Sequence, residues 1–533
     1  MQDDYCITPK LSVNYGFRYE NEPGIHERNN HYAVGLDSTV TNPATTAPGT
    51  TILGGVKFAG QNGYPTACCN SGNKYAPRVG FAYSVDPSTV VRGGFGVFYS
   101  PLVYSTSPSY APGYTQTNSL VAASSTAPVP ASYTLSNPFP NGLVGPTGNS
   151  LGYATGVGSS LTLLDSNRHA PVVMQYSADV QRDLGYGFAF KIGYVGAHAK
   201  SLPLTTNINQ LPDKYLSLGQ TALLAKVPNP YYKAGGAGLI GQSTIPYEQT
   251  LLPFPQYTTI SDSVSVGYSN YNALDLKLQK RFSHGFTLLT ALTWSSNWDN
   301  SWGASNTLNP GNNGPQDWDT STPTAYQQSI KSEYSRAIND IPVRYTITGS
   351  YDLPFGRGKM FLGGAGRLVD MAVGGWTFND VTIIQNGMPL PVTQVNANAV
   401  TGANGTIGGS VQRPNMTGTQ PCYSGSPESR LTNYINTAAF SAAPVFTYGN
   451  APRTTSCYGP GYLNTDLSLN KTFKVTERVN AQFRAEALNA FNTPQFNGFG
   501  ASNATQIQNV NFGQIQGTLG FPRLVQLGGR ITF

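Results

Sequence analysis

Charged side chains recur in this sequence at every second position of short segments whose other positions are mostly apolar. Nine of them follow this spacing: Arg18, Arg92, Asp179, Lys191, Lys277, Arg344, Arg484, Glu486 and Arg530. Successive side chains of a β-strand point to opposite sides, so the spacing predicts one polar and one apolar face. A polar face of this kind can bind polar solutes or line a water-filled passage. Arg484 and Glu486 could look catalytic in isolation, but an ion pair on such a face is the simpler interpretation.

A second group of candidates lies in a loop that is rich in carboxylates and amides. Asp299, Asp317 and Asp319 occur there beside several asparagines, and loop oxygens of these types can bind Ca²⁺. Their spacing matches no dedicated calcium loop, so a solvated loop is the favoured interpretation. The segment 356–359, G-R-G-K, lacks the spacing of a phosphate-binding loop, and the five histidines are scattered. We therefore predict no catalytic residue, no cofactor and no metal.

Five cysteines are too few for a small disulfide scaffold. Cys422 and Cys457 fall in one long loop, which is expected to lie in an oxidising compartment. A disulfide between them and a pair of free thiols are both open interpretations. Cys68 and Cys69 are adjacent and could bridge each other or stay free.

The final segment, residues 523–533, shows the strand pattern most clearly: R-L-V-Q-L-G-G-R-I-T-F. Val525, Leu527, Ile531 and Phe533 share one side, and Arg530 lies on the other. A tilted strand of about 9–11 residues crosses a bilayer. We predict that this segment is the closing strand of a transmembrane β-barrel, with lipid on the Phe533 side and water on the other.

The same alternation predicts about twelve antiparallel strands. They cover residues 11–19, 78–83, 91–99, 172–181, 188–194, 274–279, 286–294, 343–351, 376–385, 466–473, 482–487 and 523–533. Alternation is weak in 376–385, where a bulge is plausible. Long and short connections alternate along the chain, as in outer-membrane barrels with short periplasmic turns and long external loops.

The predicted faces pass a charge test. All nine charged residues named first fall on the polar side, where they avoid the cost of about 2–4 kcal/mol that Arg or Lys incurs at the lipid midplane. Lys471 is the exception, because it falls on the apolar side. It lies near a short turn, where its ammonium group is expected to reach the interface.

Composition narrows the class of protein. Charged residues make up 11% of the 533 residues, against about 25% in ordinary soluble proteins. No run of 18 apolar residues and no cluster of Lys and Arg occurs, so neither a membrane-spanning helix nor a nucleic-acid partner is predicted. The first ten residues do not resemble a signal peptide. Because a barrel must be exported, we expect this chain to be part of a longer protein.

Several segments resemble the barrel of Oar-like TonB-dependent transporters. They include Q-D-D-Y-C-I-T-P-K-L-S-V-N-Y-G-F-R-Y-E, Y-A-P-R-V-G-F-A-Y-S, V-V-R-G-G-F-G-V-F-Y, Y-N-A-L-D-L-K-L-Q-K-R-F-S-H-G-F, Y-D-L-P-F-G-R-G-K, G-P-G-Y-L-N-T-D-L-S-L-N-K and F-R-A-E-A-L-N-A-F-N-T-P-Q-F. The resemblance implies a 22-stranded barrel in the cell outer membrane, with a plug domain and the TonB complex acting through N-terminal parts that this sequence does not match. It does not imply a substrate.

These observations predict one TonB-dependent receptor-like barrel domain over residues 1–533. Its expected partners are the lipid bilayer, the barrel assembly machinery through the strand that ends at Phe533, and TonB through the missing parts. The predicted function is uptake of an unidentified ligand through a plugged polar lumen, without enzymatic activity. The alternatives are an outer-membrane binding or adhesion barrel without active transport and a secreted soluble all-β protein, which would bury apolar stripes inside a sandwich.

Overall fold

The structure is a computed structural model that describes residues 2–44, 51–69, 72–101, 111–118, 134, 136–140, 142–234, 238–300, 319–395, 411–444, 446–474, 476, 478–496 and 504–533. Thirteen strands, each pairing antiparallel with the next, form the main path of a 15-stranded sheet, and this path is here called the wall. In order they are β1 (Gln2–Thr8), β2 (Leu11–Glu22), β7 (Gly72–Asp86), β8 (Thr89–Tyr99), β10 (Val172–Gly185), β11 (Phe188–Asn207), β14 (Ile260–Ser283), β15 (Phe286–Asp299), β17 (Val343–Asp352), β18 (Trp376–Gln385), β23 (Tyr462–Lys474), β24 (Asn480–Leu488) and β27 (Leu524–Thr532).

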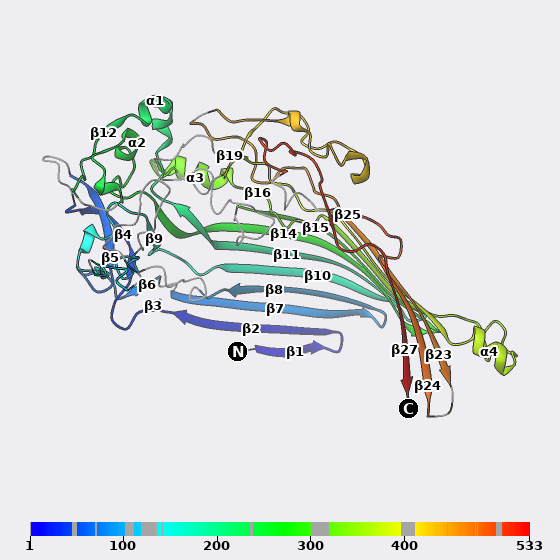
Figure 1. The fold of residues 1–533 in the computed structure, drawn as a ribbon. Helices are drawn as coiled ribbons and strands as arrows, with labels where there is room; N and C mark the ends of the chain where they lie inside the picture. The colour runs from blue at the N-terminus through cyan, green and yellow to red at the C-terminus, as the bar shows by residue number, and fades with distance from the viewer. Residues whose placement is uncertain are drawn as a thin grey trace.

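The wall curves into a trough whose two edges are β1 and β27 (Figure 1). Among the described strands these two do not pair with each other, so the sheet is open. The all-β antiparallel fold predicted from the alternation is confirmed. The structure adds β1 to the predicted twelve strands of the wall, because β1 pairs with β2 from Gln2↔Gly16 to Thr8↔Leu11. Two further short strands join the same sheet beside the wall: β9 (Leu161–Leu164) runs parallel to β14, and β16 (Ser335–Arg336) runs antiparallel to β15.

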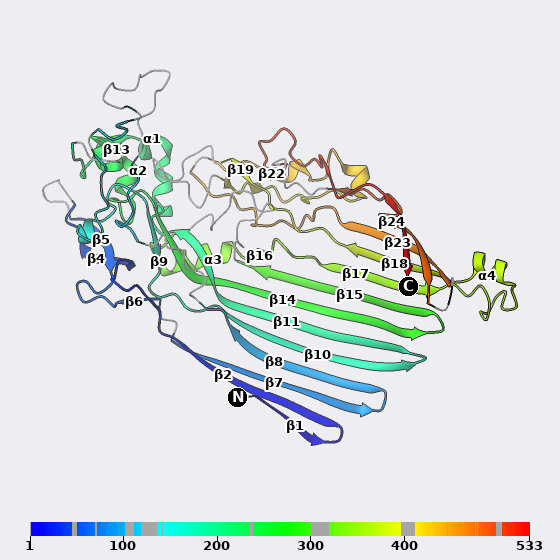
Figure 2. The same cartoon turned by 60° about the horizontal axis from the view of Figure 1, so that its bottom comes forward.

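Short connections lie at one end of the wall and long connections at the other (Figure 2). Two short turns show why the chain reverses so tightly. Tyr186 and Gly187 have φ values of 52° and 79°, and His284 and Gly285 have 53° and 75°. Positive φ at both central residues is typical of the two-residue turn that matches the twist of paired strands. The sequence analysis predicted this alternation of connections.

The connection between β17 and β18 is longer than the other short ones and contains α4 (Arg367–Val373). It projects from the short-turn end, away from the long loops (Figure 1). β18 itself pairs with β17 and β23 without a register shift. The prediction of a bulge in this strand is therefore wrong, because neither of its two pairings contains one.

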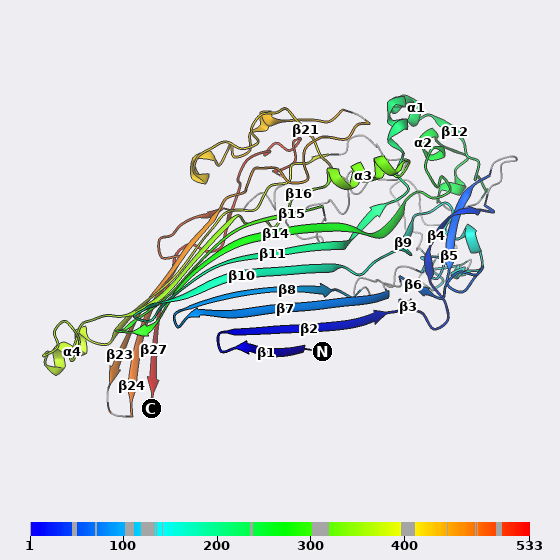
Figure 3. The same ribbon diagram turned by 180° about the vertical axis from the view of Figure 1, so that it is seen from behind.

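The long connections fold together at the opposite end into a layer here called the cap (Figure 3). Its strands are short: β3 (Ile25–His26), β4 (Ala33–Thr41), β5 (Leu53–Phe58), β6 (Ala67–Cys68), β9 (Leu161–Leu164), β12 (Lys226–Pro228), β13 (Thr244–Pro246), β16 (Ser335–Arg336), β19 (Gln394–Val395), β20 (Val411–Gln412), β21 (Asn415–Met416), β22 (Phe440–Ser441), β25 (Gln495–Phe496) and β26 (Thr518–Leu519). Its helices are η2 (Gly152–Ala154), η3 (Asp213–Leu218), α1 (Gly219–Leu223), η4 (Gly238–Gly241), α2 (Tyr247–Thr250), α3 (Pro323–Ser332), η5 (Pro427–Arg430) and η6 (Thr437–Ala439).

The longest helix, α3, has clear start signals. Thr322 accepts a hydrogen bond from the Ala325 amide at 3.1 Å, and Pro323 occupies the first helical position. A threonine cap followed by proline satisfies an amide that the helix leaves free and fixes the first φ angle. No described helix is both long and apolar enough to cross a membrane.

The buried apolar side chains gather in the cap and where it meets the wall. Six clusters occur there among the described residues. In one of them, Phe58, Leu163 and Tyr257 pack together from three different loops, and each is almost fully buried. The wall contributes few members to these clusters, so the compact core of the described chain lies in its long loops.

Candidate solute-binding face

Strand register shows which side chains share a side of the wall, because directly paired residues of antiparallel strands point the same way. Arg92 pairs with Asp179 across β8 and β10. Lys191 pairs with Lys277 across β11 and β14. Arg344 lies opposite Thr293, a position of β15 that continues the same row. The pairings therefore connect these charged residues along a single face.

The row continues to both edges of the wall. Arg18 pairs with Ala76, two positions before Arg78 on β7. Near the other edge, Arg484 lies opposite Gly528 and Glu486 opposite Gln526. Counting alternate positions from pairing to pairing places all nine charged residues named in the sequence analysis on one continuous side, here called the polar face. That this side meets a water-filled lumen stays a prediction.

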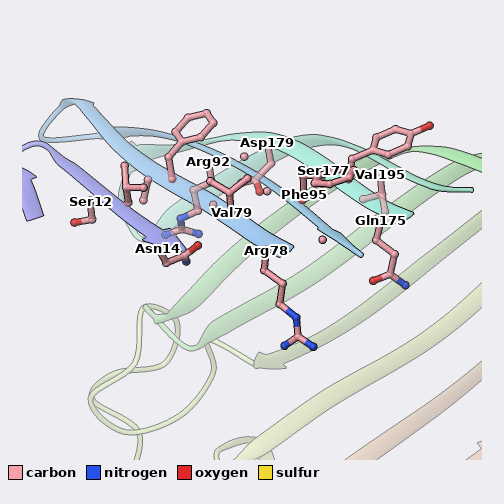
Figure 4. Close-up of a pocket in the computed structure, with 18 of the residues that line it drawn as sticks. Ser12, Asn14, Arg78, Val79, Arg92, Phe95, Gln175, Ser177, Asp179 and Val195 are labelled. Carbon is pink, nitrogen blue, oxygen red and sulfur yellow. The ribbon is translucent and has the colours of Figure 1, made fainter. Parts of the chain in front are cut away.

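One part of the polar face is hollowed where strands β1 to β14 of the wall lie side by side. A pocket of about 880 Å³ opens there. Arg78, Arg92, Gln175 and Asp179 extend from its strands, as Figure 4 shows. Arg78 was not among the predicted site residues, although it lies between apolar positions of its strand in the same way as the predicted residues do on theirs.

Glycine makes room for neighbouring side chains in this pocket. Gly80 and Gly94 face each other across β7 and β8, and Gly80 also lies opposite Asn14. A Cβ on Gly80 would lie 2.4 Å from the Asn14 side-chain oxygen, and one on Gly96 would lie 2.9 Å from the Phe98 ring. Real side chains never approach so closely, so these glycines let Asn14 and Phe98 lie flat against the sheet.

The charged groups in and beside the pocket make few and loose contacts with neighbouring side chains. Lys191 lies 3.6 Å from a carboxylate oxygen of Asp179, and Arg92 donates a hydrogen bond of 3.2 Å to the Gln181 side chain. The Arg78 guanidinium lies over the Phe98 ring at 4.7 Å. Arg78 and Arg92 are exposed. Exposed guanidinium groups can donate several hydrogen bonds to a carboxylate, phosphate or hydroxyl of a solute.

The remaining predicted polar-face residues are similarly accessible. Arg484 and Glu486 form an ion pair at 3.4 Å, with side-chain exposures of 48% and 31%. Arg18 pairs with Glu20, and Lys277, Arg344 and Arg530 are exposed. An exposed ion pair of this kind contributes only about 0–1 kcal/mol to stability. Loose, exposed charges of this kind remain available to a solute.

The opposite side of the wall carries the large apolar side chains and is here called the apolar face. The predicted closing residues Val525, Leu527 and Ile531 lie on it and are more than 60% exposed, and Phe533 is 96% exposed. They pair with small residues of β24, such as Ala485 opposite Leu527. A continuous exposed apolar sheet face needs a covering that is itself apolar.

Lys471 lies on the apolar face, as predicted, but it is almost fully buried. It pairs directly with Trp376 of β18. Its ammonium group donates to the backbone oxygens of Ala372 and Gly374 at the end of α4, the former at 3.3 Å. Positive groups are stabilised at the C-terminal end of a helix, so α4 satisfies this charge locally.

The carboxylate-rich loop does not form one cluster in the described residues. Asp299 pairs with Arg453, whereas the Asp319 carboxylate accepts from the backbone amides of Asp213 and Ser321. Asp317 lies outside the described residues. The described part of the chain contains no group of three or more His, Cys, Asp or Glu that could hold a metal ion.

Both cysteine pairs are disulfides in the structure. Cys422 is joined to Cys457, with the two Cα atoms 5.3 Å apart, and Cys68 is joined to Cys69. Cys6 is a free and exposed thiol. The Cys422–Cys457 bridge ties two parts of the loop between β18 and β23 together inside the cap.

Sequence reasoning missed a set of buried charges inside the cap. Glu333, at the end of α3, forms an ion pair of 2.8 Å with Arg413, and both side chains are at least 96% buried. Arg453 joins the nearby Asp299 carboxylate and also donates to the backbone oxygen of Glu333 at 3.3 Å. Glu333 lies in the connection between β15 and β17, whereas Arg413 and Arg453 lie in the connection between β18 and β23, so no local spacing in the sequence could have indicated these contacts.

The cap also contains two carboxyl groups that approach each other. The Asp213 amide donates to the Asp319 carboxylate at 3.3 Å. Partial burial, and then repulsion by Asp319, raises the pKa of the Asp213 carboxyl to about 6. Asp213 therefore changes its charge near neutral pH, at a place where the cap packs above the wall.

The thirteen-stranded wall, its two contrasting faces and its cap define a membrane-embedded β-sheet protein. Comparison with protein families gives the same result, because residues 1–526 match the outer membrane beta barrel domain. The chain belongs to this family and is located in the outer membrane. The compact sandwich expected of a secreted soluble protein does not occur in the described residues. No curated protein matches the sequence.

Solved structures of outer-membrane receptors and transporters are similar to this chain over part of their length. The outer membrane transporter YddB from Escherichia coli is 8% identical, with 99% of this chain and 52% of that chain covered and a TM-score of 0.40. The siderophore receptor PiuA from Acinetobacter baumannii is 10% identical, with 100% and 42% covered and a TM-score of 0.39. The ferripyoverdine receptor of Pseudomonas aeruginosa is 10% identical, with 100% and 37% covered and a TM-score of 0.38. The chain thus spans about half or less of these structures.

Proposed function

We propose that this chain is the barrel portion of a TonB-dependent transporter of the Oar-like type, which takes up a polar ligand across the outer membrane. The observation that carries the proposal is the continuous polar face, with nine charged residues in register across the wall beneath a folded cap. Membership of the outer membrane beta barrel family and the segments that resemble Oar-like transporters support it.

In this proposal the cap captures the ligand and the polar face guides it inward. Arg78 and Arg92 are exposed donors in a pocket that glycines keep open, so they suit hydroxyl, carboxylate or phosphate groups of a ligand. The aligned charges of the wall would keep the passage hydrated. Energy for transport would come from a plug and the TonB complex, which belong to the intact transporters that the sequence resembles.

We propose transport rather than catalysis. Arg484 and Glu486, the one pair with a catalytic look in the sequence, form an exposed ion pair on the polar face. A general acid or base normally has a pKa that a buried or charged environment moves toward the working pH. The exposed setting of this pair fits a role in lining the passage.

The proposal is tested by growth of cells that depend on an outer-membrane uptake route. A strain that lacks the intact gene is compared with its parent on limiting ferric siderophore, cobalamin or maltodextrin, each with and without a functional TonB. We expect one nutrient to require both this protein and TonB, and uptake of that nutrient to fall in an Arg78→Glu, Arg92→Glu variant that assembles normally.

An adhesion or binding protein gives a different result. Cells that have the protein would then bind a ligand that cells without it do not bind, but the growth of neither strain would depend on TonB. Equal growth of both strains on every nutrient would likewise count against transport. Assembly of each variant is checked by its mobility on unheated gels, because folded barrels migrate differently from heated ones.

A further inference from the structure

A lobe at the short-turn end of the wall has features that the proposed transport does not use. It is the connection between β17 and β18, residues 353–375, here called the α4 lobe. It projects from the short-turn end, opposite the cap (Figures 1 and 2). Its large apolar side chains are unusually exposed: Met360 and Leu368 are both 83% exposed, and Phe361, Leu362, Val369 and Met371 are about half exposed.

The lobe is held on the apolar side of the wall. Trp376 and Lys471 are paired residues of the apolar face. The Trp376 indole donates to the Ala372 oxygen at 3.0 Å, and the Lys471 ammonium donates to the Ala372 and Gly374 oxygens. These contacts fix the end of α4 against the side that family membership places in lipid, not against the polar face.

The lobe is also internally ordered, so its exposed apolar groups are not the result of a loose loop. The Arg357 amide donates to the Asp370 carboxylate at 2.6 Å, which ties the first turn to α4. Backbone bonds join Gly356 to Phe361 at 3.0 Å and Gly358 to Gly363 at 3.0 Å. A segment whose backbone groups bond internally can enter the boundary of a bilayer without leaving them unsatisfied.

Charge indicates which covering suits this surface. Three exposed cations, Arg357, Lys359 and Arg367, belong to the same lobe as the apolar side chains, whereas the one acid of the lobe, Asp370, accepts a hydrogen bond from the Arg357 amide. Apolar side chains beside exposed cations are typical of segments that lie in a membrane interface and bind anionic lipid headgroups. The surface continues directly from the lipid-facing side of the wall.

We propose that the α4 lobe lies in the interface of the membrane leaflet at the short-turn end, with its apolar side chains among the acyl chains and its cations on phosphates of anionic phospholipid. This lobe anchors the β17–β18 end of the wall at a fixed depth. The proposal rests on the outer-membrane location of the family and not on transport.

The test uses the intact protein with the free thiol removed by Cys6→Ser, since the other four cysteines are in disulfides. A single new thiol is placed on the lobe by Leu368→Cys and labelled with an environment-sensitive fluorophore. The matched control is Arg478→Cys in the turn between β23 and β24, an exposed position outside the α4 lobe. Both proteins are reconstituted in vesicles of phosphatidylcholine, with and without phosphatidylglycerol.

We expect blue-shifted emission from the label at position 368 and strong quenching by nitroxide lipids labelled near the headgroup, with neither at position 478. Phosphatidylglycerol should increase the quenching at position 368, and Arg357→Gln, Lys359→Gln, Arg367→Gln should abolish that increase. Each cation near an anionic surface changes binding by about fivefold.

Water-like emission at position 368 in both kinds of vesicle would overturn the proposal and would point to a periplasmic protein as the covering. Quenching that does not respond to phosphatidylglycerol or to the three substitutions would overturn the assignment of an anionic headgroup. Because Leu368 is 83% exposed, its substitution should leave the fold intact, and mobility on unheated gels verifies this for each variant.

Discussion

The cap and the wall of this protein bury apolar side chains in opposite ways. In the cap, Phe58, Leu163 and Tyr257 are almost completely enclosed by other protein atoms. In the wall, Tyr15 and Phe17 are about half exposed although they belong to long, regular strands. In this chain, regular backbone hydrogen bonding is therefore concentrated in the wall, whereas the burial of apolar side chains is concentrated in the cap.

The difference indicates two solvents. Loops in water must exclude it from their apolar groups by packing against one another, as in any soluble domain. A strand in lipid gains its stability from complete backbone pairing, and its outer side chains are covered by acyl chains. One chain can then have a protein-like core at its long-loop end and none along its strands.

Charge follows the same division. Exposed Arg and Lys on the polar face are spread along the wall with few close partners. In the cap, Glu333 and Arg413 are enclosed and paired at 2.8 Å. Removing one partner of an enclosed pair leaves an unpaired charge and is costly, whereas exposed pairs contribute little. The cap therefore depends on its specific contacts more than the polar face does.

The largest expected effect comes from opening a cavity in the cap. Phe58→Ala removes a ring that lies 6.3 Å from the Tyr114 ring inside a closed cluster, and neighbouring loops cannot fill the space. We expect a loss of about 3–5 kcal/mol of cap stability. Phe95→Ala on the apolar face should cost about 1 kcal/mol, because that ring is already 40% exposed and lipid can replace it.

Limited proteolysis in denaturant measures cap stability, and mobility on unheated gels measures the wall. Phe58→Ala should be cleaved in the cap at lower denaturant while the wall still migrates as folded. If the two alanine variants lost the same stability in denaturant, cap and wall would be covered by the same medium. The contrast drawn between cap and wall would then be wrong.

The next effect comes from placing a charge on the apolar face. Val180 lies there near the middle of β10, opposite Ile192 and Val91. Val180→Arg should destabilise the protein in lipid vesicles by about 2–4 kcal/mol. Ser177→Arg, on the polar face of the same strand, should have little effect because water reaches it.

Urea titration in vesicles, followed by tryptophan fluorescence, gives both free energies of unfolding. A larger loss for Ser177→Arg than for Val180→Arg would mean that the two faces have been assigned to the wrong solvents.

The wall could be predicted from sequence because its signal is local. Alternation in residues 11–19 or 523–533 fixes which side each residue faces, and a strand must keep that period throughout. β1 was missed because Q-D-D-Y-C-I-T carries acids at adjacent positions, so neither side looks apolar. β18 was ambiguous for a related reason: Asp380 falls on the apolar face, whereas Val381 and Ile383 fall on the polar one.

The cap could not be predicted because its contacts join residues far apart in the chain. Ile52 packs with Tyr231, and Leu211 packs with Phe446. Loops of Ser, Asn, Pro and Gly have no periodicity that would mark these residues as buried. The same limit hid the Glu333–Arg413 pair. The Cys422–Cys457 and Cys68–Cys69 disulfides were both considered from the sequence, because cysteines are conspicuous wherever they occur.

The smallest expected effect concerns pH and should again be confined to the cap. The pKa of Asp213 is raised to about 6 by partial burial and by Asp319, above the value of about 3.9 expected when unfolded. The folded state therefore binds this proton more tightly, and cap stability should fall as pH rises from about 4 through 6.

Asp213→Asn removes the charge and should stabilise the cap at pH 8 by about 1 kcal/mol, since partial exposure screens the interaction. Limited proteolysis in denaturant at pH 8 and pH 4 measures the change. The cap of the variant should be more stable than that of the parent at pH 8 and equally stable at pH 4. Stabilisation of equal size at both pH values would assign the effect to packing instead of charge. A change in the mobility of the variant on unheated gels would show that the wall is not independent of the cap.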